Sequence, residues 1–517
     1  MNRNESIQQL NSTSQWDIII IGGGATGLGC AVDAASRGYK TLLLEKYDFA
    51  KGTSSRATKL VHGGVRYLEQ GNIRLVREAL MERGRLLKNA PHVCHTLAFV
   101  VPFYKTWQKI YYGFGLQVYE WLSGKLSLGA TKLLSKKGAL RNLPDLSADK
   151  LKGGVLYFDG QFDDSRLAIN LAQTAVEHSA VVINYVGVNG FIKEANIIKG
   201  VMAQDELNAA QFEIKAKVVI NATGVFADSL LQLAEGHTEQ TIAPSQGIHL
   251  VVDKYFFGGN AGMMVPKTDD GRVLFAIPWH DKLLLGTTDT PIENIVTEPK
   301  PMKDEIDFVL SHFNRYASSA IGYGDVKSVF VGLRPLAKSS NTKETSVMPR
   351  DHHVAVLPSG LIHVTGGKWT TYRSMAEHAV DKAVQTAGLN FISCKTKNLP
   401  IHGWTTKNDD DYLSIYGADA AAIKQLMEED ISSKEKIHPG YPYTKAEVKW
   451  VIRYEMAITV EDVLARRIRL LFLDAKAAIE TAPAVANIMA LEMGKDQKWI
   501  NDQAATFIKL AKGYLIQ

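Results

Sequence analysis

The first strongly patterned stretch of the chain lies at residues 17–46, where apolar and small residues predict a strand, a helix and a second strand. Ile18–Ile21 form an uninterrupted apolar run, which is typical of a buried parallel strand. Small and apolar residues then recur at helical spacing from Leu28 to Gly38, and Thr41–Leu44 form a second apolar run. This order predicts a βαβ unit of about thirty residues.

A second group of apolar patterns lies between residues 241 and 330, where short strand-like stretches alternate with turns. His249–Val252, Val273–Ile277 and Lys282–Leu285 have the length and apolar content of strands. Because short strands that follow one another across turns pair most readily as neighbours, this region favours an antiparallel sheet.

From about residue 400 the pattern becomes helical. Thr444–Glu447 and Thr459–Asp462 have the spacing of a capping box or a close variant, in which side chains satisfy free N–H groups at a helix start. The polar stretch at 405–411 is a predicted linker.

Together these patterns predict an α/β protein with a discontinuous Rossmann-like domain, an α+β substrate domain with an antiparallel sheet, and a helical C-terminal cap. A chain of 517 residues is too long for a single core, which agrees with several domains. The expected ranges are 17–90, 151–240 and 331–390 for the first domain, 91–150 and 241–330 for the second, and 400–517 for the third.

The turn after the first strand has the sequence Gly22-x-Gly24-x-x-Gly27. Its glycines allow a tight turn, close approach of a pyrophosphate to the backbone, and close packing of the helix on the strand. Ala25 and Thr26 begin the helix, where free N–H groups and a partial positive charge favour phosphates. In the context of strand, helix and strand, this turn predicts dinucleotide binding.

The acidic residue and the later glycine turns indicate which dinucleotide is bound. Glu45 ends the second strand, where a carboxylate can accept both ribose hydroxyls and disfavours a 2′-phosphate. Lys217–Gly224 and Ile362–Lys368 also end a strand in small residues and glycine. Segments so far apart suit a long cofactor held by one discontinuous domain, which favours FAD over a soluble nicotinamide cofactor.

Charge and cysteine content exclude several classes of protein. The chain has 59 basic and 54 acidic residues, a net charge of +5, which is too small to indicate nucleic-acid binding. Its three scattered cysteines predict neither a metal site nor a disulfide framework. The first sixteen residues are polar, so no secretory signal is expected, and no apolar run reaches the ~18–20 residues that span a bilayer. We therefore expect a cytoplasmic protein that at most lies against a membrane.

Segment 91–150 combines aromatic with basic residues. Within 103–141 there are seven cations and one acid, Glu120, interleaved with tyrosine, phenylalanine and tryptophan. This composition favours an element that docks on an anionic membrane interface. The alternative is a pair of aromatic helices packed on the core, with the lysines solvated.

Motifs in the same order along almost the whole chain carry a family resemblance. They include GGVRYLE, GLRPL and GGKWTTYR and lie at 53–68, 221–224, 277–279, 286–289, 332–336, 349–351, 366–373 and 453–467. By these motifs the chain resembles the FAD-dependent glycerol-3-phosphate dehydrogenases of the D-amino-acid oxidase-like superfamily. The resemblance excludes only the first sixteen residues.

The resemblance implies a reaction and its partners. The reaction is the oxidation of sn-glycerol 3-phosphate to dihydroxyacetone phosphate by hydride transfer to FAD, with electrons passed to a membrane quinone. The family's quinone-linked members are peripheral membrane proteins, which implies a place on the inner face of the cell membrane. The alternatives are a glycerol-3-phosphate oxidase that uses O2 and releases H2O2, an amine or amino-acid oxidase, and a flavin-binding protein without turnover. The oligomeric state stays open, a homodimer included.

Oxidation of a secondary alcohol needs a base that takes the hydroxyl proton. His62, beside Gly63 and Gly64, and His249 are the candidates, because an imidazole titrates near pH ~6.5. The resemblance implies a role for both histidines and leaves open which is the base.

The phosphate of the substrate is dianionic and must be bound by cations. Arginine forks match phosphate oxygens in pairs, which favours Arg334 and Arg350 as anchors. By resemblance, Arg334 and Lys368 act at the catalytic centre, and Arg66, Tyr67 and Arg350 contact the substrate.

The resemblance also places residues at the cofactor, with simple loop capping as the alternative for Ser54 and Ser55. The expected cofactor residues are Gly22, Gly24, Ala25, Thr26, Gly27, Glu45, Thr53, Ser54, Ser55, Thr223, Gly224, Gly367, Lys368 and Thr370.

Overall fold

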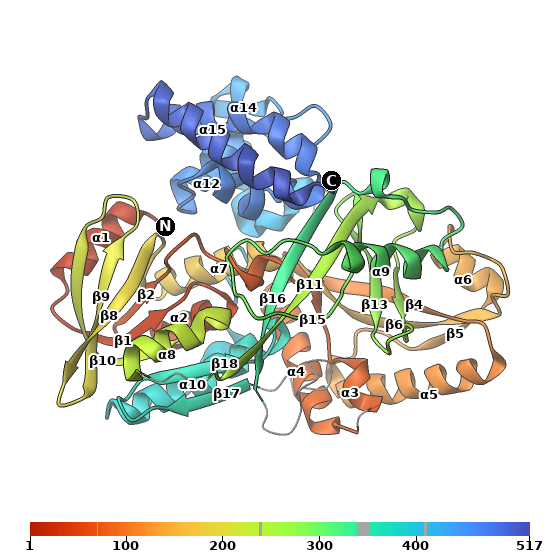
Figure 1. Ribbon diagram of the computed structural model, residues 1–517, viewed down its shortest axis with the longest axis horizontal. Coiled ribbons are helices and arrows are strands. Elements are labelled where there is room, and N and C mark those ends of the chain that lie inside the picture. Colours follow the sequence, from red (N-terminus) through yellow and green to blue (C-terminus); the bar gives the residue numbers. More distant parts are fainter. Residues whose placement is uncertain (70, 237–239, 339–351, 408–410, 517) are drawn as a thin grey trace.

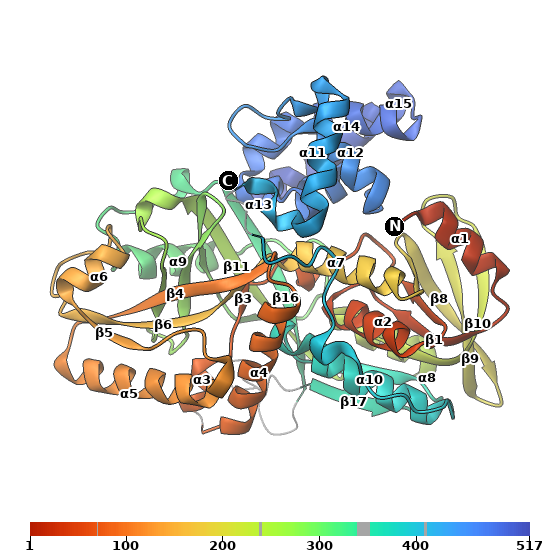
Figure 2. The same cartoon turned by 180° about the vertical axis from the view of Figure 1, so that it is seen from behind.

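The computed structural model describes residues 1–69, 71–236, 240–338, 352–407 and 411–516. Two sheets form the frame of the molecule, and a group of helices from the C-terminal part lies above both (Figures 1 and 2). A short helix, α1 (Arg3–Ser12), precedes the first strand and is capped by the side chain of Asn2.

The first sheet contains the predicted βαβ unit. Its strands run in the order β17-β18-β10-β1-β2-β7, and neighbours are parallel except β17, which pairs antiparallel with β18. The bounds are β1 Trp16–Ile21, β2 Thr41–Leu44, β7 Val181–Ile183, β10 Gln211–Asn221, β17 His352–Val356 and β18 Ile362–Gly366, with β8 (Val186–Glu194) and β9 (Ile197–Asp205) attached through β10.

Helices cover this sheet, and its centre is fully buried. Ile18, Ile19 and Ile20 have no exposed surface, which agrees with the apolar run in the sequence. The helix of the βαβ unit, α2 (Ala25–Arg37), ends at Gly38, as the sequence predicted, and packs against α7 and α10. Gly38 is in the left-handed conformation that commonly ends a helix. The other helices around the sheet are α7 Asp164–Glu177, α8 Ala227–Glu235 and α10 Tyr372–Thr386.

The second sheet is larger and mostly antiparallel. Its strands run in the order β15-β11-β14-β13-β12-β4-β6-β3, with β16 paired to β11, β5 paired to β6, and only the β12–β4 contact parallel among the described pairs. The bounds are β3 Leu60–Val61, β4 Cys94–Phe103, β5 Lys132–Ser135, β6 Gly153–Phe162, β11 Ile242–Asp253, β12 Gly262–Val265, β13 Leu274–Trp279, β14 Lys282–Gly286, β15 Thr290–Pro291 and β16 Ser328–Ala337.

Two long strands of this sheet differ from the expected domain ranges. β6 lies within 151–240, and most of β16 lies within 331–390. Both ranges were assigned from the sequence to the first domain. Both strands hydrogen-bond in the second sheet, β6 with β4 and β16 with β11. Because an apolar strand pattern does not specify its pairing partner, the sequence could not place these strands.

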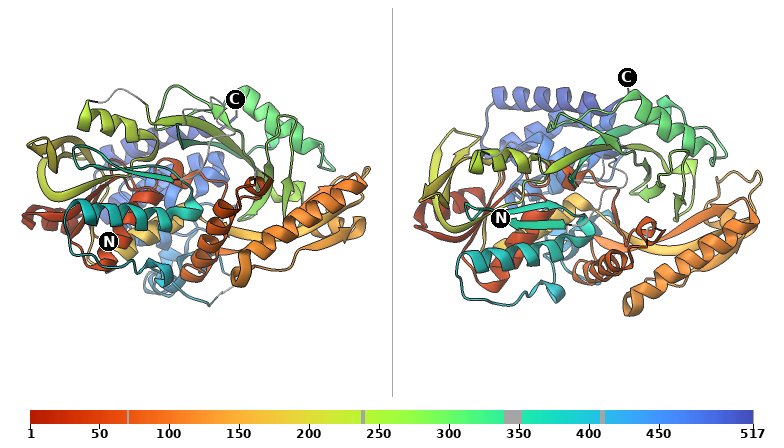
Figure 3. Two further views of the ribbon diagram at one scale, coloured as in Figure 1. Left: turned by 90° about the horizontal axis from the view of Figure 1, so that it is seen from below. Right: turned by 60° about the horizontal axis from the view of Figure 1, so that its bottom comes forward.

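Helices on either side of β4 lie at the outer edge of the second sheet, and two of them, α5 (Thr106–Ser123) and α6 (Lys136–Asn142), come from the aromatic segment 91–150. The others are α3 Val65–Glu69 and α4 Ile73–Asn89, and α9 (Lys303–Asn314) lies beside β11 and β14. Figure 3 shows α5, in orange, as a long rod along this edge in both views. Among the described helices, none has the length and hydrophobicity to cross a membrane.

The C-terminal part is helical, with α11 Ala420–Glu429, α12 Lys445–Tyr454, α13 Leu470–Leu473, α14 Ala475–Met493 and α15 Gln497–Ala511. The predicted capping box is present, because the Thr444 N–H donates to Glu447 at 2.8 Å. Thr459 and Asp462 exchange hydrogen bonds in the same way at the start of a π-helical turn, Asp462–Arg467.

Buried arginines join the C-terminal part to the first sheet. Arg466 and Arg467 both donate to Asp48, which follows β2, and Arg469 donates to Asp164 at the start of α7. These five side chains are at most 3% exposed. A buried charge is tolerated only when it is paired and hydrogen-bonded, and each of these arginines has such a partner.

Candidate active site

The glycine turn after β1 has the conformation that phosphate binding requires. Gly22 has a φ of +109°, and a Cβ there would lie 2.7 Å from the carbonyl oxygen of Ala222. A Cβ at Gly27 would overlap the carbonyl oxygen of Gly22. Gly24, the N-cap of α2, has no side chain of its own at the helix start, so its backbone can approach a ligand closely.

Glu45 lies directly beside this turn. Its carboxylate accepts the N–H of Gly23 at 2.5 Å and that of Tyr47 at 2.8 Å. Burial raises the pKa of Glu45, and the two backbone hydrogen bonds lower it in part. The acid is therefore held where the sequence predicted the ribose end of a dinucleotide.

The loop at 53–55 meets the same turn from the other side. Ser54 accepts the N–H of Ala25 at 2.9 Å, and Thr53 donates to the carbonyl oxygen of Leu333 at 2.6 Å. Ser55 is buried and donates to Gly52 at 3.4 Å. Ser54 therefore has the capping role that the sequence left as an alternative, and it has it at the expected phosphate turn.

A cavity of about 170 Å³ lies next to this loop and brings together three distant segments of the chain. Its lining includes residues that the sequence assigned to the cofactor or the reaction: Thr53, His62, Arg334, Gly367, Lys368 and Thr370. Thr223 and Gly224 follow β10, and Thr223 approaches Gly22, since a Cβ on that glycine would lie 3.1 Å from its Cα.

These features fit FAD. A glycine turn for a pyrophosphate and a cavity for a ring system are linked by the loop at 53–58, as a long, extended cofactor requires. Gly366 and Gly367 both have positive φ, and a Cβ on Gly367 would overlap the sulfur of Met375. The backbone can adopt this bend only with glycine at these positions, and it leaves main-chain groups at the cavity wall.

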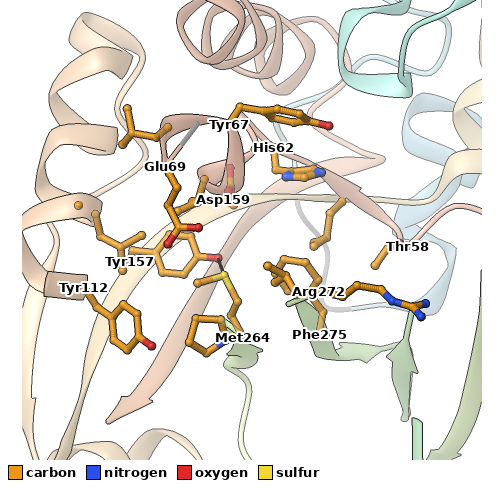
Figure 4. A pocket seen from close by; sticks show the side chains of 18 of the residues that line it. Thr58, His62, Tyr67, Glu69, Tyr112, Tyr157, Asp159, Met264, Arg272 and Phe275 are labelled. Carbon is orange, nitrogen blue, oxygen red and sulfur yellow. Dashed lines mark hydrogen bonds between the residues drawn. The ribbon is translucent and has the colours of Figure 1, made fainter. Parts of the chain in front are cut away.

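A second, larger cavity of about 660 Å³ adjoins the first, and both share His62, Thr58, Leu60 and Arg334. Figure 4 shows His62 pointing into the large cavity, with Tyr67 on one side and Phe275 on the other. The far wall belongs to α5 and is mainly aromatic and apolar, formed by Trp107, Ile110, Tyr111, Tyr112, Phe114 and Leu116.

His62 occupies the junction of the two cavities. It follows β3 directly, and its backbone N–H donates to the hydroxyl of Thr370 at 3.2 Å. Its ring meets Phe275 edge-on, with centroids 6.4 Å apart. The imidazole is therefore placed between the predicted ring site and the large cavity.

His249 is in a different environment. It is 2% exposed and lines neither of these two cavities, and its ring stacks on Phe330 at a centroid distance of 5.0 Å. Burial, and then the charges of Lys59 and Arg334, hold the pKa of His249 well below its usual range. The imidazole is neutral at neutral pH, and its Nε2 lies 3.0 Å from the hydroxyl of Thr58.

Arg334 lines both cavities, and Lys368 lines the smaller one. Arg334 donates to the hydroxyl of Thr287 at 3.0 Å and to the carbonyl oxygen of Thr288 at 2.9 Å, and its guanidinium lies 3.6 Å from Asp289. The Lys368 ammonium lies 4.0 Å from the centre of the Tyr67 ring.

The structure describes neither the side chain of Arg66 nor any part of Arg350, two of the expected substrate contacts. Arg350 lies outside the described residues, and of Arg66 the structure describes only its place in α3. The resemblance remains the basis for assigning both of them to the substrate.

Several lining residues were not identified from the sequence: Thr58, Tyr157, Asp159, Met264, Arg272 and Phe275. Thr58 lies within the 53–68 motif, so the motif itself was an available signal. The others come from β6, β12, β13 and the turn before β13, which the second sheet brings to the same cavity as β3 and α3, and no local pattern indicates this arrangement.

Sequence comparison assigns the chain to a family. The family described as "FAD dependent oxidoreductase" matches residues 17–381, and the family "C-terminal domain of alpha-glycerophosphate oxidase" matches residues 361–500. A probable mitochondrial glycerol-3-phosphate dehydrogenase of Caenorhabditis elegans is 39% identical, over 99% of this chain and 76% of the relative. The mitochondrial glycerol-3-phosphate dehydrogenase of Rattus norvegicus is 38% identical, over 95% of this chain and 72% of the relative.

The chain belongs to the FAD-dependent glycerol-3-phosphate dehydrogenase family.

Solved structures agree with this family. The glycerol-3-phosphate dehydrogenase of Bacillus halodurans, solved in complex with FAD, superposes with a TM-score of 0.81 at 29% identity, covering 99% of this chain and 98% of that one. An L-α-glycerophosphate oxidase of Mycoplasma pneumoniae, also with FAD, has a TM-score of 0.58 at 17% identity and covers 75% of this chain, which shows a shared fold. The predicted family, fold class and cofactor, FAD, are confirmed.

Proposed function

We propose that this dehydrogenase-family protein oxidises sn-glycerol 3-phosphate to dihydroxyacetone phosphate and passes the electrons to a membrane quinone. The observation that carries the substrate half is the meeting of His62, Arg334 and Lys368 around two adjoining cavities. A base and two cations beside a ring site are the groups that oxidation of a phosphorylated alcohol needs. The names of the relatives support the same substrate.

His62 is the proposed base. It lines both cavities, whereas His249 lies behind Thr58, where burial and then two neighbouring cations lower its pKa. A group that accepts a substrate proton must reach it, which favours His62. Bound FAD supplies the acceptor for the hydride that leaves the substrate carbon. His62 takes the hydroxyl proton as the carbonyl forms.

Arg334 and Lys368 are proposed to hold the anionic substrate, together with Arg66, Tyr67 and Arg350 by family resemblance. Hydrogen bonds to a charged group contribute roughly 1.5–3 kcal/mol each. Two or three of them separate glycerol 3-phosphate from glycerol by orders of magnitude in affinity. Arg334 is oriented by Thr287 and Thr288 before any substrate binds, so little reorganisation is required.

The large cavity supports a quinone as electron acceptor. It extends from His62 to the aromatic wall of α5, and it is lined mainly by apolar side chains. A long apolar space beside the reacting centre suits a hydrophobic acceptor better than it suits O2, which needs no pocket of that size. The oxidase reaction is the second candidate, since a glycerophosphate oxidase shares the fold.

Peripheral contact with an anionic membrane is proposed for α5 and its neighbours, and the family resemblance favours the inner face of the cell membrane. Several large apolar side chains are more than half exposed there: Trp107, Ile110, Phe114, Trp121 and Leu133. The same stretch of sequence, 103–141, also contains seven basic residues. Exposed aromatic residues among cations are typical of a surface that inserts into an anionic interface.

Electron transfer to a soluble quinone analogue tests the acceptor. With glycerol 3-phosphate as donor, the purified protein is expected to reduce the analogue rapidly and to release little peroxide in air. Stoichiometric peroxide with slow quinone reduction would assign the chain to the oxidases instead.

A further inference from the structure

The turn that carries His62 is hydrogen-bonded to a tyrosine of α5. The backbone N–H of Gly63 donates to the hydroxyl of Tyr119 at 2.7 Å. The approach is close, because a Cβ on Gly63 would lie 2.8 Å from the Tyr119 ring and 2.7 Å from Leu80. Glycine at this position therefore allows Tyr119 to reach the main chain of the turn.

The Tyr119 hydroxyl is itself held by a buried ion pair. It donates to Asp159 Oδ2 at 2.8 Å, and Arg83 donates to the other oxygen, Oδ1, at 2.8 Å. Arg83 also donates to Ser123 and to the carbonyl oxygen of Leu126, just beyond the end of α5. The network thus ties α4, α5 and β6 to one peptide group of the active-site turn.

All three side chains of this network are at most 2% exposed. Burial, and then the charge of Asp159, raise the pKa of Tyr119 far above its usual range, so the hydroxyl keeps its proton. A protonated hydroxyl that donates to Asp159 must use a lone pair for the Gly63 N–H, so the direction of the chain of hydrogen bonds is fixed. Replacing a buried ion pair by apolar residues is often neutral or stabilising, so stability alone gives no reason for this network.

The main chain around His62 is anchored on both sides. The N–H of His62 donates to Thr370, in the segment assigned to the cofactor, and the next N–H, that of Gly63, donates to Tyr119. The imidazole stands between these two anchors, at the junction of the cavities.

We propose that Tyr119 is a positioning residue for His62: its hydroxyl, held by Asp159 and Arg83, fixes the Gly63–Gly64 turn and thereby the place of the imidazole. This inference rests on the proposed function, in which His62 takes the hydroxyl proton of the substrate. Tyr119 acts through the backbone and contacts neither substrate nor cofactor in this account.

Tyr119→Phe tests the proposal, because it removes the hydroxyl and keeps the ring. The measurement is the rate constant for flavin reduction by glycerol 3-phosphate under anaerobic conditions, as a function of substrate concentration. We expect the limiting rate to fall ~10–100-fold, since a small misplacement of a catalytic group has an effect of this order. The apparent substrate dissociation constant and the FAD content are expected to stay within about twofold of wild type, because an anchor of His62 affects the proton transfer and not the binding.

Tyr416→Phe is the matched control. Tyr416 is also 2% exposed, and its hydroxyl donates to a buried carboxylate, Glu447, at 3.2 Å, in the C-terminal part of the chain. This variant loses the same type of hydrogen bond and is expected to keep the wild-type rate. Asp159→Asn is a second test, which keeps the shape of the side chain and removes the charge that holds Arg83 and Tyr119, and it is expected to lower the limiting rate several-fold.

The outcomes separate the inference from the proposed function. If glycerol 3-phosphate does not reduce the flavin of the wild-type protein, the proposed function fails. If the wild type is reduced and Tyr119→Phe keeps its rate, or if Tyr119→Phe and Tyr416→Phe lose rate equally, only the positioning role is overturned. Should Tyr119→Phe not fold, an unchanged limiting rate in Asp159→Asn overturns it as well.

Discussion

The imidazole of His249 and the hydroxyl of Thr58 lie 3.0 Å apart, and of these two residues it is Thr58 that lines both cavities. His249 is neutral, since burial, and then the charges of Lys59 and Arg334, lower its pKa. We therefore expect any influence of His249 on the reaction to pass through the Thr58 hydroxyl.

This relationship predicts the behaviour of Thr58 variants. Thr58→Val, which keeps the shape and removes the hydroxyl, is expected to lower kcat by about tenfold, the effect of one lost hydrogen bond. Thr58→Ser retains the hydroxyl and is expected to restore most of the activity. The measurement is the steady-state turnover of both variants. If Thr58→Val and Thr58→Ser have equal kcat, the Thr58 hydroxyl has no role in the reaction.

A second prediction concerns the base. His62→Asn is expected to lower the rate of flavin reduction by about 10²–10⁴, because a positioned base contributes that much. FAD content is expected to remain normal, since the phosphate turn lies elsewhere. His249→Asn, compared under the same conditions, is expected to lose less. The opposite ranking of the two variants would transfer the role of base to His249.

A third prediction concerns the phosphate turn. Gly27→Ala would place a methyl group on the carbonyl oxygen of Gly22, so the turn must open. We expect the variant to be purified with little or no FAD, as measured by the flavin to protein absorbance ratio. Gly324→Ala is the control, because Gly324 has no neighbour within 4 Å of the added methyl group and no positive φ. Normal FAD content in Gly27→Ala would exclude this turn as the cofactor site.

The pH dependence of stability offers a fourth prediction. His402 donates to Glu177 and Asp419 at 2.5 and 2.8 Å, and, against a lowering by burial, these hydrogen bonds raise the pKa of His402 to about 9. A raised folded-state pKa stabilises the fold fully below the unfolded value of ~6.5, and this contribution is lost as the pH rises through about 9. His402→Gln is therefore expected to lower the Tm at pH 6 and to leave it nearly unchanged at pH 10. A Tm difference that is the same at both pH values would contradict this assignment.

A fifth prediction concerns the membrane surface. Replacing Trp107, Phe114 and Trp121 together by serine is expected to weaken binding to anionic lipid vesicles by tenfold or more, since each buried aromatic side chain contributes roughly 1.5–3 kcal/mol. Binding of the wild type is expected to weaken with added salt. Phe391→Ser is the control, because Phe391 is 68% exposed in another part of the chain. An equal loss in the control, or no binding of the wild type, would refute docking through α5.

The fold was predictable where structure depends on neighbours in the sequence. The βαβ unit, its glycine turn and the end of its helix at Gly38 follow from apolar spacing and from the conformations that glycine alone adopts. The capping box at Thr444 is of the same kind. The pairing partners of β6 and β16 were not predictable. The order of apolar and polar residues in a strand indicates which of its faces is buried, but it does not indicate which strand pairs with it.

The candidate site shows the same division. His62, Arg334 and Lys368 were found through motifs, and the structure brings them together. The burial of His249 was missed, because β11 is buried along both faces and its sequence has no alternation to show which side chains reach a cavity. Tyr119 and Asp159 were missed because the network depends on α5 and β6, elements that meet the turn only in three dimensions.

The central claim is that a flavin bound between the Gly22–Gly27 turn and the His62 cavity is reduced by a three-carbon phosphate ester. Anaerobic addition of glycerol 3-phosphate to the purified yellow protein tests it most directly. The account predicts rapid bleaching of the visible flavin band by glycerol 3-phosphate and none by the same concentration of glycerol. A protein that contains no flavin after reconstitution, or a flavin that glycerol bleaches equally well, would contradict it.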